Sequence, residues 1–149
     1  MMYGRSSTAA SIERTGWRDE ALSKRHRRYG FDLPATDIDF LMVEYDGGRA
    51  RALIEFKHER ARPQLAREST YRALMDLGDR AGIPVFACRY AGDFSRFFVV
   101  PLNWRACSYL PERASLSEME YVRLLYRIRG REMPQGLFDS DGHLTGHFP

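Results

Sequence analysis

The sequence has few or none of several features that mark particular protein classes. It has only two cysteines, Cys88 and Cys107, which form no CxxC pair and lie in no His/Cys cluster. We therefore expect neither a disulfide scaffold nor a zinc finger, and assign both residues to packing. No apolar run approaches the ~18 residues that a membrane-spanning helix needs, and the first residues lack the apolar stretch of a secretory signal. We expect a cytoplasmic protein with no membrane partner.

Neither a GxGxxG nor a GxxxxGK[ST] loop occurs, which argues against a nucleotide-binding small-molecule enzyme. Lysine is also scarce, because only Lys24 and Lys57 are lysines among 23 basic residues. We interpret this scarcity as a sign that position 57 requires a compact, titratable ammonium group.

Charge is distributed unevenly along the chain. Residues 1–35 hold seven Lys/Arg against four Asp/Glu, residues 36–59 three against six, and residues 60–149 thirteen against ten. An acidic centre between basic flanks fits a protein that brings a cation to a polyanion, although ordinary surface charge gives the same balances.

No repeat or linker divides the 149 residues, so we expect one domain over 1–149, with a core at about 15–130 and irregular tails at 1–14 and 131–149. Periodicity predicts helices over 16–28, 63–81 and 118–129, with a capping box of Ser117 and Glu120 before the last helix and stops at Gly82 and Gly130. It also predicts strands over 29–34, 36–45, 49–57, 84–90 and 95–102. A helix between the strands 49–57 and 84–90 implies that these two pair in parallel, whereas 36–57 reads as an antiparallel hairpin. The sequence therefore predicts an α/β fold with a mixed sheet flanked by helices, plus a C-terminal helix.

The register of the hairpin decides where its acidic residues lie. If 46–48 is a three-residue loop closed by its flanking residues, Asp39 lies opposite Glu55 and Asp37 opposite Lys57, on one face; a two-residue loop would send the acids to the other face. Facing carboxylates repel each other unless a cation lies between them, and Mg²⁺ prefers oxygen ligands. Lys57 would orient or help to deprotonate a water there; a plain Lys57–Asp37 salt bridge is the alternative reading.

Asp39, a gap of fifteen residues and then Glu55-Phe56-Lys57 resemble the signature of the PD-(D/E)xK nuclease superfamily, which has the restriction-endonuclease-like fold. The resemblance implies an αβββαβ core and hydrolysis of phosphodiesters, usually in DNA, with Mg²⁺ (or Mn²⁺). It implies that Asp39, Glu55 and the Phe56 carbonyl hold the metal and that Lys57 acts on the water. Many members add a glutamate from the first helix, and Glu20 occupies that place.

Further candidates surround this motif. Nucleic-acid-binding candidates are cations at the end of the first helix and after the motif: Lys24, Arg25, Arg27, Arg28, Arg60 and Arg62. Favourable interaction of cations with a helix C-terminus explains the first group equally well. Secondary candidates are Asp37, the alternative metal ligand; Gln64; and His26, followed by His58 and Tyr71. The segment 139–142 is similar to a calcium loop but lacks its distal glutamate, so we expect a turn.

The sequence thus predicts a small Mg²⁺-dependent endodeoxyribonuclease, structure-directed or weakly sequence-specific, of the kind found in DNA repair, phages or mobile elements. The substrate would be DNA, with branched DNA and RNA left open, and a homodimer would supply the two sites that cutting both strands requires. The alternative is a catalytically silent nucleic-acid-binding or assembly module of the same fold.

Overall fold

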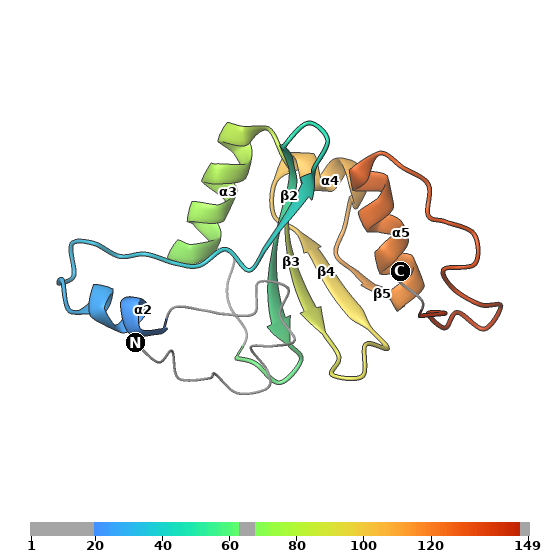
Figure 1. Cartoon of the computed structure of the whole chain (residues 1–149), viewed down its shortest axis with the longest axis horizontal. Coiled ribbons are helices and arrows are strands. Elements are labelled where there is room, and N and C mark those ends of the chain that lie inside the picture. The colour runs from blue at the N-terminus through green and yellow to red at the C-terminus, as the bar shows by residue number, and fades with distance from the viewer. Residues whose placement is uncertain (1–19, 63–67, 147–149) are drawn as a thin grey trace. The chain divides into compact units, whose positions relative to one another are not determined.

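A five-stranded mixed sheet organises the chain (Figure 1). The computed structural model describes residues 20–62 and 68–146. The strands are β1 (Phe40–Glu44), β2 (Arg49–His58), β3 (Val85–Tyr90), β4 (Phe97–Pro101) and β5 (Ala114–Leu116), in the spatial order β1-β2-β3-β4-β5. β2 and β3 pair in parallel, and the other neighbours pair antiparallel. The predicted α/β class, the hairpin and the parallel pair are confirmed.

Helices cover both faces of this sheet. These helices are α3 (Ser69–Ala81), α4 (Trp104–Tyr109) and α5 (Glu118–Arg129), whereas α2 (Glu20–Arg27) belongs to the separate unit 1–36. α3 lies on one face, and α4 and α5 lie on the other (Figure 1). Among the described residues, no helix has the length and apolarity needed to cross a membrane. Residues 1–36 and 37–149 form two separate units, so the expectation of one domain over 1–149 stays a prediction.

Successive side chains of β2 point to opposite faces of the sheet, so β2 contributes to a hydrophobic cluster on each face. Leu53 packs on the α3 side with Tyr71 and Leu74, whereas Ile54 packs on the other side with Leu124 of α5. Fully burying one such side chain contributes about 1.5–3 kcal/mol. Because β2 is covered on both faces, a charged residue on it needs a specific partner.

The two cysteines differ in their surroundings. Cys88 is buried in the core, and this burial raises the pKa of its thiol to about 12. Cys107 is exposed on α4. The predicted packing role therefore holds for Cys88 and is wrong for Cys107.

Helix ends follow the predicted caps. Ser117 and Glu120 form a reciprocal capping box at the start of α5, where the Ser117 hydroxyl accepts from the Glu120 N–H at 3.2 Å and the Glu120 carboxylate accepts from the Ser117 N–H at 3.0 Å. Gly82 (φ 72°) and Gly130 (φ 76°) end α3 and α5 in the left-handed conformation.

Three elements differ from the prediction. Residues 29–34 form no strand, because the chain turns at Gly30 (φ 108°) and runs back to α2, where the His26 ring is 2.7 Å from the Leu33 carbonyl oxygen. The strand that precedes the hairpin in the expected αβββαβ order is therefore missing from the described residues. Conversely, α4 and β5 were not predicted; α4 spans only 6 residues and β5 only 3, too short for a periodic signal.

Asn103 ties α3, β3 and α4 together. Its Oδ1 accepts from the N–H groups of Val85 and Ala106, and its Nδ2 donates to Asp79 Oδ1 and the Ile83 carbonyl, each at 3.0 Å. The side chain is buried and uses two acceptor and two donor positions, so it caps α4 and fixes the start of β3.

Candidate catalytic carboxylates and lysine

The pairing of β1 with β2 places the candidate carboxylates side by side. Phe40 pairs with Ile54, and continuing this alignment by one residue puts Asp39 opposite Glu55, on the sheet face that α3 covers. The predicted register is therefore confirmed at this end of the hairpin. Asp37 lies before β1 begins, so the expectation that the strand ladder pairs it with Lys57 is wrong.

The predicted turn is also wrong. Glu44 pairs with Arg49, which leaves a four-residue turn at 45–48, and a bulge at Arg51 then shifts the ladder by one residue. These two departures cancel, so the Asp39 end keeps the expected alignment. The bulge has its own structural reason, because Arg51 Nη2 donates to the Ile128 carbonyl at 2.8 Å near the end of α5.

Asp39 and Glu55 have very different surroundings. Asp39 is exposed, and its Oδ2 accepts a hydrogen bond from the Phe56 N–H at 3.0 Å, which ties it to β2 just beyond the end of β1. Glu55 is only 6% exposed. Its Oε1 lies 3.7 Å from Lys57 Nζ, and its Oε2 is buried with no hydrogen-bond donor among the described residues.

The electrostatics of Glu55 follow from this geometry. Burial and then the Asp39 charge raise its pKa to about 7, and Lys57 opposes the shift. A hydrogen bond between the Asp39 and Glu55 carboxyls adds to the rise, and such a bond exists only when one of the two is protonated. When both are ionised, two carboxylates lie side by side, and Lys57 is the one cation paired with Glu55 among the described residues. The site then suits a cation with a preference for oxygen ligands, such as Mg²⁺.

The backbone of Phe56 lies beside Asp39. The N–H and C=O groups of one strand residue point to the same neighbouring strand. Its carbonyl is therefore on the side of β2 where its N–H meets Asp39. The predicted metal ligands Asp39, Glu55 and Phe56 thus come from adjacent positions of the hairpin.

Tyr71 lies near Glu55, and the charges of Arg89 and Glu68 act on Tyr71 as well. Tyr71 of α3 is buried, and its pKa is raised by burial and then by the charge of Glu55, with smaller contributions from Glu68 (upward) and Arg89 (downward). Arg89 is the register partner of Lys57 across the parallel pair. Sequence reasoning included Tyr71 but missed Arg89 and Glu68. The parallel crossover was the only available signal for Arg89, and the register of β2 on β3 was not predicted.

The remaining predicted residues belong to other segments of the chain. Glu20 begins α2, but its side chain is outside the described residues, as is Gln64. The cations of α2 are exposed and belong to the unit 1–36: Lys24, Arg25 and Arg27, with Arg28 directly after the helix. His26 contacts the Leu33 carbonyl. Arg60 and Arg62 are exposed just beyond the end of β2.

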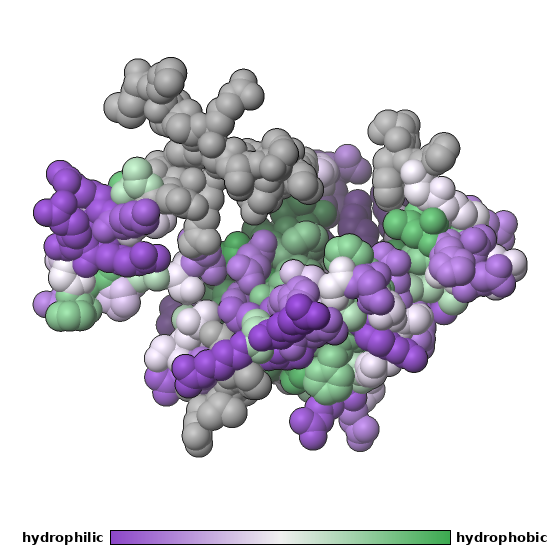
Figure 2. Space-filling view, turned by 90° about the horizontal axis from the view of Figure 1, so that it is seen from below, coloured by the Kyte–Doolittle hydropathy of each residue, from purple (hydrophilic) through white to green (hydrophobic). Residues whose placement is uncertain are grey.

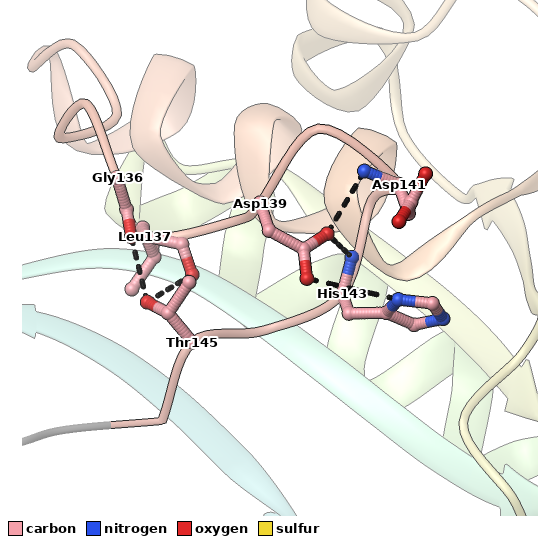
Figure 3. A network of polar contacts seen from close by, with 6 residues as sticks. All are labelled: Gly136, Leu137, Asp139, Asp141, His143 and Thr145. Atoms are coloured by element: carbon pink, nitrogen blue, oxygen red, sulfur yellow. Dashed lines mark hydrogen bonds and ion pairs between the residues drawn. The ribbon is translucent and has the colours of Figure 1, made fainter.

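A second group of possible metal ligands lies in the turn at 139–143 (Figure 3). Asp139, Asp141 and His143 are exposed, with one ligand atom of each within 4.8 Å of the others. Asp139 Oδ1 accepts from the N–H groups of Asp141 and His143, both at 2.9 Å. These hydrogen bonds are those of a turn, which the sequence predicts here, and they explain why the three side chains lie close together.

Comparison of the chain with protein-family models, curated proteins and solved structures gives no significant match. The geometry of Asp39, Glu55 and Lys57 is therefore the main indication of its function.

Proposed function

We propose that this protein is a metal-dependent nuclease that hydrolyses DNA phosphodiester bonds with Mg²⁺ or Mn²⁺, with weak sequence specificity. The restriction-endonuclease-like fold is part of the proposal, supported by the hairpin, the crossover helix α3 and the parallel strand β3. We also propose a cytoplasmic location and a homodimer for cutting both strands.

One observation carries the proposal: the buried oxygen Oε2 of Glu55 has no donor within residues 20–62 and 68–146, while the Asp39 carboxylate lies beside it. When Glu55 and Asp39 are both ionised, a structural ion pair would explain Lys57 and one carboxylate, but not the second carboxylate or the unpartnered oxygen. Burying an ionised carboxylate without compensation costs several kcal/mol, about the range given for effective ion desolvation in proteins. A divalent cation bound by both carboxylates compensates this cost.

Each residue has a role that its position permits. Asp39, Glu55 and the Phe56 carbonyl would hold the metal, which when bound lowers the pKa of a water and offsets charge on the phosphate. The Lys57 side chain is 31% exposed and its ammonium lies 3.7 Å from Glu55, so it faces both the carboxylates and solvent. From there Lys57 would donate hydrogen bonds to the attacking water or to a phosphate oxygen.

The test is incubation of the purified protein with linear, branched and single-stranded DNA, and with RNA, in Mg²⁺, Mn²⁺ or EDTA. We expect metal-dependent cuts in DNA that fall by at least about 100-fold in Lys57→Ala and Glu55→Gln, while DNA binding survives. Glu112→Gln, an exposed glutamate outside the site, is the matched control and should cut normally. Binding without cleavage in any metal would instead support the silent nucleic-acid-binding module.

A further inference from the structure

One edge of the sheet carries a distinctive surface next to the candidate site. β2 and β3 run in parallel and end at this edge, the lower one in Figure 1, where the β3–β4 turn also lies. We call residues 58–62 and 91–96 the rim. Arg89 Nη1 ties its first segment down by donating to the carbonyls of His58, Glu59 and Ala61 at 3.2, 3.1 and 2.7 Å. Lys57 directly precedes the rim. A DNA strand bound at the candidate site would therefore lie next to the rim.

Phe94 is the unusual residue of the rim. Among the described residues it is the one non-glycine with a positive φ, 61°, in a turn that glycine or asparagine would adopt more easily. Holding such a conformation costs about 1–3 kcal/mol. Its ring stacks on Tyr90 and Phe97, with centroids 6.0 and 6.4 Å apart, yet the residue is 52% exposed. The turn therefore maintains a strained backbone that presents half of an aromatic side chain to solvent.

Arginine side chains accompany this ring. Arg60, Arg62 and Arg96 of the rim are exposed. The two acids of the rim, Glu59 and Asp93, each accept from a backbone N–H of the β3–β4 turn, at 3.5 and 3.0 Å. In Figure 2, which views the molecule from below, hydrophilic and hydrophobic side chains lie side by side. A surface of this kind is complementary to a polyanion that also offers flat apolar faces.

We propose that the rim binds unpaired nucleotides of a DNA strand, with a base stacked on Phe94 and the phosphates bound by the rim arginines. This inference rests on the proposed function and names its substrate class: DNA with single-stranded or branched segments. An aromatic ring with neighbouring arginines is the usual platform for unpaired bases. The bases of a continuous duplex are stacked on one another, so their faces do not reach an external ring.

Fluorescence of 2-aminopurine tests the proposal on the full chain in EDTA, where metal-dependent cutting is stopped. The probe base is placed in the single-stranded arm of a flapped DNA or, for comparison, inside a blunt duplex. Wild type and Phe94→Tyr should quench the arm probe, and Phe94→Leu, which keeps apolar cover over Tyr90, should not. Phe94→Leu should bind flapped DNA about 5- to 100-fold more weakly and the duplex equally well. Trp104→Leu, an exposed aromatic beyond the far end of β4, should leave both unchanged.

The outcomes separate the two proposals. The role of Phe94 would be overturned if wild type and Phe94→Leu bound flapped DNA equally well. It would also be overturned if Phe94→Leu lost the same factor of affinity for flapped and duplex DNA, even if cleavage is observed. Selective loss on flapped DNA supports that role, and it does so even if no metal produces cleavage. In that last case the nuclease proposal fails while the base-binding rim stands.

Discussion

Replacing Glu55 by glutamine should stabilise the protein in the absence of metal. Glu55 is buried, and its pKa is raised to about 7 by burial and by the Asp39 charge. Glutamine has nearly the same shape, carries no charge, and its amide can donate to the Asp39 carboxylate. The variant therefore removes the electrostatic penalty and keeps the packing.

The magnitude follows from linkage. The native pKa of about 7 lies above the ordinary glutamate value of 4.5, so between these two pH values the native state binds more protons than the unfolded state. The free energy of unfolding therefore falls as pH rises through this window, and the loss is complete above pH 7. At 1.36 kcal/mol per pKa unit, the ceiling is about 3 kcal/mol.

Urea denaturation in EDTA at pH 4 and pH 8 measures this effect. We expect wild type and Glu55→Gln to differ little at pH 4, and the variant to be more stable by up to about 3 kcal/mol at pH 8. With an m-value of about 1–3 kcal/mol/M, that is a midpoint difference of roughly 1–3 M urea. Glu112→Gln should follow wild type at both pH values. A constant difference between wild type and Glu55→Gln across this range would refute the reasoning.

Three further predictions concern the site and the scaffold. Asp39→Asn removes the charge that helps to raise the pKa of Glu55, so that pKa should fall and the stability of the metal-free protein should vary less between pH 4 and 8, as read by the same titration. Asn103→Ala breaks four hydrogen bonds, three of them buried, and should lower the free energy of unfolding by about 2–4 kcal/mol in urea, with unchanged stability contradicting its linking role. Gly78→Ala places a Cβ 2.1 Å from a methyl carbon of Val85, so the melting temperature should fall with a loss of about 1–3 kcal/mol.

Local sequence signals predicted the parts of the fold that depend on local chemistry. The caps at Ser117 and Gly130 bound α5 as expected, because the hydrogen bonds and backbone angles of a helix end involve neighbouring residues. Alternation likewise placed Asp39 and Glu55 on one face. The turn at 45–48 was misjudged because the bulge at Arg51 is set by a distant carbonyl in α5.

Contacts between distant segments explain what the sequence did not show. Residues 29–34 have strand-like composition, but a hydrogen-bond acceptor for His26 holds them as a turn. Arg89 joins the surroundings of the site only through the register of β2 on β3, which no local pattern specifies. The conformation of Phe94 also depends on tertiary context, since its ring stacks with Tyr90 and Phe97.

Binding of Mn²⁺, followed by electron paramagnetic resonance or calorimetry at pH 6 and 8, tests the central claim most directly. We predict an ion held by Asp39 and Glu55, tighter at pH 8, with proton release on binding at pH 6 because the metal requires ionised Glu55. Asp39→Asn and Glu55→Gln should lose this ion, and Asp139→Asn, in the exposed turn, should retain it. Binding that persists in Glu55→Gln and vanishes in Asp139→Asn would contradict the account.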